Sequence, residues 1–335
     1  MTNFQAMLEL PRKIESETEG EQVLNLSYQM LAPLGVPTLI IDPAEYDPQL
    51  GLWCVETDDT IENHLKQRLD QVLHHFYGPD HAAVRDFQQN PGRFWMTLLN
   101  TVDYCVHSRQ MIAHALNAGT LFNVVICPRT NNTGALLIKH GLHIAEDHIA
   151  DIPGSDIEWN FIRLWHEFGH GLRGVSEAEA DKVSALMHRH VFTDPQALMV
   201  LSDFRAAWAM IHHDQTQALT QRGWALVDTL DQVVSGFDEE TGWDQTMFMV
   251  TTPAPADSHA ADVYSVGHHL KTICKAAFAE PDLLMLSMMA DHAAIKGQFH
   301  NQNQMRIARR FALAAQRISL GRPAYQATTA RLQPA

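Results

Sequence analysis

The sequence predicts a predominantly helical α+β protein in which a small β-containing module is embedded in a helical body. Apolar residues recur at intervals of three and four over most of the chain, which is the period of amphipathic helices. The runs typical of strands are short, and most of them fall in one stretch of the chain that is rich in turn residues. Apolar residues make up 46% and charged residues 19% of the 335 positions, a balance typical of globular proteins.

The first predicted region covers residues 1–118 and is mainly helical. It contains one short strand near 37–42, within VPTLIIDP, which Pro43 closes. The segment TIENHLKQRLDQVLHHF, residues 60–76, has apolar side chains three and four positions apart and is predicted to be a helix. A further helical pattern continues to Gly119, a residue typical of helix C-termini.

The second predicted region, residues 119–192, holds the β-containing module. TLFNVVICP is a β-rich run that ends at Pro128. GALLIKHGLHIAED, residues 134–147, is placed to form an exposed edge strand that could hold an extended substrate by main-chain pairing. An ordinary sheet strand explains this segment equally well. Two helices are expected to follow, at about 156–172 and 176–192.

The third predicted region, residues 193–335, is mostly helical. One helix is expected to begin in TDPQALMV, with Asp194 as its cap and Pro195 at its first position. Near the end of the chain, RIARRFALAAQRISLGR carries a run of arginines. Such a run is expected to be a solvated helix face rather than a site for an acidic partner. Its members are Arg306, Arg309, Arg310, Arg317 and Arg322.

Composition excludes several classes of function. The formal net charge of −15 argues against broad attraction to nucleic acid or to anionic membranes. The four cysteines form no C-x-x-C pair, which fits a reducing compartment better than a disulfide framework or a cysteine zinc site. Signal-peptide and membrane-spanning patterns are both missing. We therefore expect a cytoplasmic protein without nucleic-acid partners or membrane insertion, while signal-less secretion and the oligomeric state stay open.

The strongest chemical signal lies in LWHEFGHGLRGVSEAEAD, residues 164–181. His166 and His170 are four residues apart, so a helix directs both imidazoles from one face, and neutral imidazole is a zinc ligand. Glu167 is placed beside them, as the general base for a zinc-bound water must be. Both histidines lie away from the expected buried stripe of this helix, so they are not core-filling residues. That stripe consists of Phe161, Trp165, Phe168 and Leu172.

A third zinc ligand is expected from the helix that follows. Ser176 and Glu179 form an S-x-x-E capping box, which gives Glu179 a local role. Glu177 and Asp181 are four residues apart and share a face. Glu177 can therefore ligate the metal, while Asp181 accepts the free N–H of a zinc-bound histidine. Glu179, Asp181 and His188 stay open as alternative third ligands.

The motif HEFGH followed by EAEAD resembles the zincin metallopeptidases, in particular the gluzincin branch, which carries a glutamate ligand in an E-x-x-x-D pattern on a second helix. The resemblance implies a zincin-like core with one zinc ion per chain, held by His166, His170 and Glu177. It also implies Glu167 as the base and Asp181 as the residue that orients a histidine. Six residues separate His170 from Glu177, which is shorter than gluzincins usually have and nearer to the metzincin spacing.

These observations lead us to expect a zinc-dependent metallopeptidase, an endopeptidase, that acts on a peptide or protein substrate. Zincins commonly stabilise the developing oxyanion with a downstream side chain, and Tyr264 and His259 are candidates. Positions on a helix surface explain each of these two residues better. The alternative is a helical regulatory or binding protein with an inactive module or a structural zinc site, in which a fourth protein ligand closes the metal. A metal-free helical scaffold is the third interpretation.

We predict that the purified protein contains about one equivalent of zinc per chain, because two histidines and one carboxylate are the usual protein ligands of a catalytic zinc site. Metal analysis after gel filtration in metal-free buffer measures this content. Protein that stays metal-free after incubation with zinc would support the scaffold interpretation instead.

Overall fold

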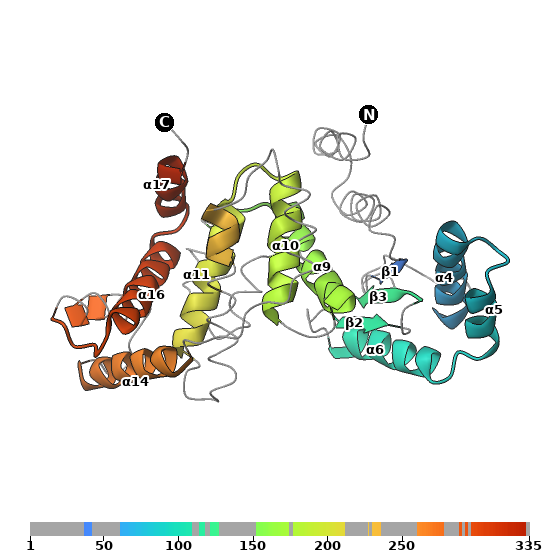
Figure 1. Cartoon of the computed structure of the whole chain (residues 1–335), viewed down its shortest axis with the longest axis horizontal. Helices are drawn as coiled ribbons and strands as arrows, with labels where there is room; N and C mark the ends of the chain where they lie inside the picture. The colour runs from blue at the N-terminus through green and yellow to red at the C-terminus, as the bar shows by residue number, and fades with distance from the viewer. Residues whose placement is uncertain are drawn as a thin grey trace. The chain divides into compact units, whose positions relative to one another are not determined.

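Among the residues that it describes, the computed structural model is predominantly helical with a small sheet, in agreement with the predicted class (Figure 1). It describes residues 37–41, 61–108, 114–117, 121–126, 152–173, 177–211, 227, 230–235, 260–277, 288–289, 292–293 and 296–332. The chain divides into two compact units. Unit 1 consists of Met1–Asn131 and Asn160–Ser176, and unit 2 consists of Asn132–Trp159 and Glu177–Ala335.

The sheet belongs to unit 1 and has the strand order β1-β3-β2. Its strands are β1 (Thr38–Ile41), β2 (His114–Asn117) and β3 (Asn123–Ile126). β1 runs parallel to the central β3, and β2 runs antiparallel to it. Every residue of β1 and β3 is buried, as expected for parallel strands covered on both faces. The strands predicted from VPTLIIDP and TLFNVVICP are therefore confirmed.

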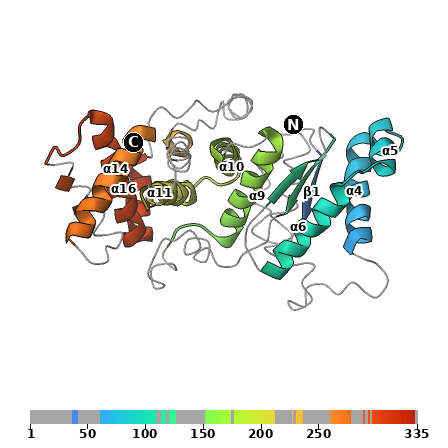
Figure 2. The same ribbon diagram turned by 90° about the horizontal axis from the view of Figure 1, so that it is seen from below.

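Three helices of unit 1 cover one face of this sheet (Figure 2). They are α4 (Ile61–Tyr77), α5 (Ala82–Gln89) and α6 (Phe94–Ser108). α4 contributes Leu65, Leu69 and Leu73, spaced four residues apart, to a core that also contains alternate residues of β1 and β3. The Arg68 guanidinium and the Tyr77 hydroxyl then donate to backbone carbonyls of β1 and of the residues before β3, at 2.7 Å in both cases.

The predicted helix that continues to residue 118 is wrong at its C-terminal end. α6 ends at Ser108, and His114–Asn117 forms strand β2. The sequence MIAHALN carries helical spacing, but the backbone of β2 pairs with β3 from His114 opposite Ile126 to Asn117 opposite Asn123. Long-range pairing with a buried central strand outweighs local helix propensity here. The expected stop at Gly119 lies outside the described residues.

The helix that carries the histidine motif is α9 (Asp156–Arg173), close to its predicted bounds. The division between the two units falls within it, because Trp159 belongs to unit 2 and Asn160 to unit 1. The second predicted helix is α10 (Glu177–Val191), and it is also confirmed. The three residues between these helices, 174–176, lie outside the described residues.

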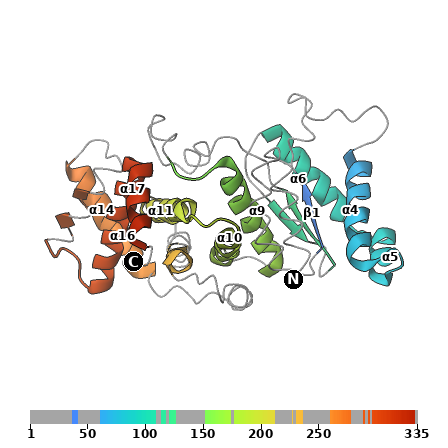
Figure 3. The same cartoon turned by 90° about the horizontal axis from the view of Figure 1, so that it is seen from above.

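Unit 2 contains a cluster of helices around α16, which contacts α11, α14 and α17 (Figure 3). Their bounds are α11 (Gln196–Ile211), α14 (Ala260–Ala277), α16 (Gln302–Leu320) and α17 (Arg322–Leu332). The expected cap of α11 is confirmed, because the Asp194 carboxylate accepts a 3.0 Å hydrogen bond from the Gln196 amide. Pro195 immediately precedes the first residue of this helix.

The arginine run was expected to be a solvated face, which is wrong for Arg310 and Arg317. Their side chains are only 12% and 10% exposed, and both form ion pairs with the fully buried Asp203 of α11, at 2.6 and 3.2 Å. Arg310 also pairs with Asp231 at 2.8 Å and donates to Ser202. The two arginines are seven residues apart and share the packed face of α16, which the sequence run alone does not reveal. The other three arginines are exposed.

Some predicted features fall outside the described residues, among them the edge strand at 134–147 and the start of the chain before residue 37. The three predicted regions stay a prediction, although strands from both sides of residue 118 share one sheet. None of the described helices combines the length and apolar character required to cross a bilayer.

We predict that Asp203→Ala lowers the free energy of unfolding by about 3–5 kcal/mol, because it leaves buried arginines without their shared counter-ion. Arg309→Ala is the matched control on the exposed side of the same helix and should change stability by less than about 0.5 kcal/mol. Chemical denaturation followed by circular dichroism measures both. Equal stability of the two variants would contradict an important contribution from the Asp203 ion pairs.

Candidate metal centre

The rotation of α9 separates a buried side from a half-buried one. The expected aromatic stripe is confirmed where it is described, because Phe161, Trp165 and Phe168 are at most 2% exposed. The histidines and the glutamate of the motif are half-buried, on the other side of the helix. At 100° per residue, both histidines lie roughly 100–140° from Trp165. Burial of the apolar side therefore leaves the side with the motif partly accessible.

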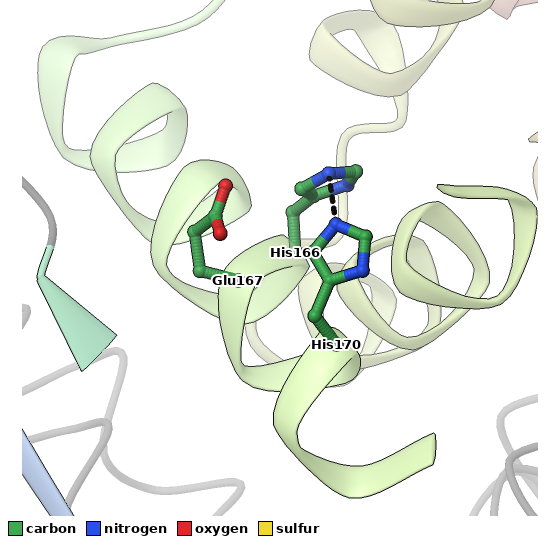
Figure 4. Close-up of side chains that lie close together, drawn as sticks. All are labelled: His166, Glu167 and His170. Atoms are coloured by element: carbon green, nitrogen blue, oxygen red, sulfur yellow. Dashed lines mark hydrogen bonds between the residues drawn. The ribbon is translucent and has the colours of Figure 1, made fainter. Parts of the chain in front are cut away.

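The two imidazoles of His166 and His170 converge, and Figure 4 shows their rings facing one another from successive turns of α9. Their Nε2 atoms are 3.2 Å apart, and the ring planes are nearly perpendicular at 89°. In the absence of a metal, an N–H of one ring can donate to the lone pair of the other. The spacing of four residues thus does bring both nitrogens to one point.

This separation matches the distance between neighbouring ligands in a zinc site. Two nitrogens that each lie about 2.0–2.1 Å from one ion and 3.2 Å from each other subtend an angle of about 100–106° at that ion. The tetrahedral angle is about 109°, so small side-chain adjustments are sufficient for both rings to bind one zinc ion. The donor set of the structure therefore fits the metal that the sequence predicts.

Glu167 lies beside this pair and completes the group. One potential ligand atom from each of His166, Glu167 and His170 lies within 4.8 Å of the other two, which makes this the group among the described residues that can hold a metal ion. Glu167 projects from the neighbouring side of the helix (Figure 4). A carboxylate on the residue next to a ligand is better placed to contact a water at the metal than to share the metal with both rings.

The N-terminus of α9 carries a capping box that the sequence reading missed. The Ser155 backbone N–H donates to Glu158 Oε2 at 2.8 Å, and the Glu158 backbone N–H donates to Ser155 Oγ at 3.3 Å. The sequence signal was present as S-x-x-E in SDIE. Gly154 precedes the box with φ of 107°, and any Cβ there would collide with the Trp159 indole, so glycine is required.

The predicted third ligand and its partner lie on α10 in unit 2. Glu177 is the first residue of this helix, and its side chain lies outside the described part of the structure. Asp181 is 1% exposed, and Arg205 of α11 holds its two oxygens with bonds of 3.0 and 3.1 Å. Sequence reasoning missed Arg205.

Among the alternative third ligands, His188 already contacts Glu158 and Phe192. It is fully buried, its Nε2 lies 3.3 Å from Glu158 Oε1, and its ring stacks on Phe192 at 4.7 Å. Burial, the largest effect, lowers the pKa of His188 despite the opposing hydrogen bond and charge of Glu158, so the ring is neutral. The side chain of Glu179 lies outside the described residues.

Of the two candidates for stabilising the oxyanion, the structure describes Tyr264 but not His259. Tyr264 lies in the first half of α14 in unit 2, is 43% exposed and stacks on His268 one turn later. This is a helix-surface position of the kind that the sequence also suggested. His259 lies outside the described residues.

Comparisons with protein-family models, with curated proteins and with solved structures found no match to this chain. The assignment of a candidate metal centre therefore rests on the geometry of α9 and on the chemistry of its residues.

We predict that His166→Ala and His170→Ala each weaken zinc binding by more than about 100-fold, because loss of a direct ligand exceeds the 10- to 100-fold effect of losing an outer hydrogen-bond partner. His74→Ala, an exposed histidine of α4, is the matched control and should bind zinc like the wild type. Competition with a chromophoric chelator gives the affinities. Unchanged binding in either site variant would exclude that histidine as a ligand.

Proposed function

We propose that the protein is a zinc-dependent metallopeptidase with His166 and His170 as zinc ligands and Glu167 as the general base. The observation that carries this proposal is the 3.2 Å approach of the two Nε2 atoms, which is close to the separation of neighbouring ligands on a tetrahedral zinc ion. The carboxylate within 4.8 Å of this pair supplies the third element of the H-E-x-x-H chemistry.

In this proposal Glu177 is the third zinc ligand, on the basis of the sequence. Two histidines and one glutamate form a ligand set of hydrolytic zinc sites and leave one position for water or substrate. Asp181 would orient one of the histidines through the ring N–H that does not face the metal. The ion pair with Arg205 fixes the position of this carboxylate.

In this proposal each motif residue of α9 has a separate role in peptide hydrolysis. Bound zinc supplies Lewis acidity that activates a water molecule and polarises the scissile carbonyl. Glu167 accepts the proton of the attacking water at a carboxylate oxygen and returns it to the leaving amine. His166 and His170 would hold the ion through Nε2. Their half-buried position is consistent with a site that substrate reaches rather than with a closed structural one.

We predict that Glu167→Gln keeps zinc binding but lowers peptide hydrolysis by about 10²- to 10⁴-fold, the usual contribution of a positioned acid–base group. An unfolded, fluorescence-quenched protein substrate and a zinc-affinity measurement separate the two properties. Glu62→Gln on α4 is the control that should keep full activity.

Two outcomes would contradict the proposal in different ways. Wild-type activity in Glu167→Gln would exclude its role as the base. Zinc-loaded wild-type protein that hydrolyses none of a broad set of peptides, with a fourth protein ligand on the metal, would favour the structural-zinc alternative.

A further inference from the structure

The first turn of α9 is fixed by a chain of contacts within unit 2. Ser155 donates its backbone N–H and its hydroxyl to Glu158 Oε2, at 2.8 and 3.2 Å. The other oxygen, Oε1, faces His188 Nε2 of α10 at 3.3 Å. Glu158 therefore serves as a helix cap and as the partner of a buried histidine at the same time, and it joins the start of α9 to the last turns of α10.

The environment of His188 determines which of its ring nitrogens carries a proton. The ring is 0% exposed, stacks on Phe192, and its Nδ1 has no hydrogen-bond partner. Burial, the largest effect, and the charge of Arg189 disfavour a positive charge on the ring, and together they outweigh Glu158 and Asp194, so the pKa of His188 is lowered. The neutral ring thus donates Nε2–H to Glu158. A second proton would have to enter at the unpartnered, buried Nδ1.

Glu158 remains ionised in this arrangement. Burial alone would raise the pKa of its carboxyl, but the hydrogen bonds from His188 and Ser155 outweigh that effect and lower it. His166 lies eight positions after Glu158, which is roughly 12 Å along one continuous helix. The anchored turn and the histidine pair therefore lie on the same helix.

We propose that His188 is a positioning residue for the metal-binding helix: through Glu158 it anchors the first turn of α9, and acidification favours an open form in which the protonated ring is solvated. The consequence for zinc rests on the proposed function, whereas the anchoring itself does not. Acidification below about pH 6.5 would then loosen the start of α9.

The direction of the pH effect follows from a difference between two states: His188 is buried when the contact with Glu158 is closed and hydrated when it is open. When the contact opens, the ring enters water and regains an ordinary pKa near 6.5, above its lowered value in the closed state. Below about pH 6.5 the open state therefore binds more protons, and its population rises by up to about tenfold per pH unit until the pH reaches the lowered pKa. Above about pH 6.5 neither state is protonated, so opening no longer depends on pH.

Amide hydrogen exchange at Trp159 tests the anchor, because its N–H donates to Ser155 O within the first turn. We expect the protection factor of this amide to fall by up to about tenfold per pH unit from pH 6.5 to 5.5 in the wild type. In His188→Gln, which keeps an N–H near the position of Nε2 but does not titrate there, protection should stay constant over this range.

His190→Gln is the matched control. His190 is also buried on α10, and burial together with the charge of Arg189 lowers its pKa to about 4, but it is not the residue bound to Glu158. This variant should keep the pH dependence at Trp159. The proposal is overturned if His188→Gln retains that dependence or if His190→Gln removes it. Constant wild-type protection between pH 7.5 and 5.5 also overturns it, even if the variants do not fold.

A second measurement at pH 7.5 connects the anchor to the metal. His188→Leu removes the donor to an ionised carboxylate, and we expect about 10- to 100-fold lower protection at Trp159, with His188→Gln restoring it. Zinc affinity should fall about tenfold in His188→Leu and recover in His188→Gln. Lower protection with unchanged zinc affinity would refute the positioning role. Absence of zinc binding in every form, including the wild type, would refute the proposed function. The hydrogen-exchange measurement would then still test the anchor by itself.

Discussion

The burial of one aromatic stripe on α9 is the constraint on which the candidate centre depends. Phe161, Trp165 and Phe168 are almost completely buried, so the helix cannot rotate about its axis without exposing large apolar surfaces. With that rotation fixed, the side that carries the histidines can only be the half-buried one. The metal-site geometry is thus a consequence of core packing, since the two histidines need no further element to bring their nitrogens together.

Buried ion pairs are a second constraint, and they act on how the described helices of unit 2 pack against one another. Asp203 of α11 lies between Arg310 and Arg317 of α16, and Arg205 of α11 holds Asp181 of α10. Removing such charges from water is costly, and close pairing offsets that cost only in one relative placement of the helices. We infer that these pairs determine the register of α11 against its neighbours as much as they determine stability. A chain with a net charge of −15 thus places some of its arginines inside the fold.

The candidate centre could be predicted from the sequence where its geometry is local. Residues four apart on a helix share a face in any protein, so the convergence of His166 and His170 required only that the segment be helical. The role of Glu177 involves a second helix, and it remains a prediction. The pairing of His188 with Glu158, thirty residues apart, left no periodic signal in the sequence, because neither residue type nor spacing indicates which distant side chains meet.

By itself, the sequence determined the helices whose apolar spacing is regular, the strands that are continuous apolar runs, and the face of α9 that carries the motif. These features follow from interactions within a few residues or from the burial of one side of a segment. Only the tertiary structure decided that His114–Asn117 is a strand and that Arg310 and Arg317 turn inward. In both cases the deciding partner, β3 for the strand and Asp203 for the arginines, is far away in the chain, and its pairing energy exceeds the local preference.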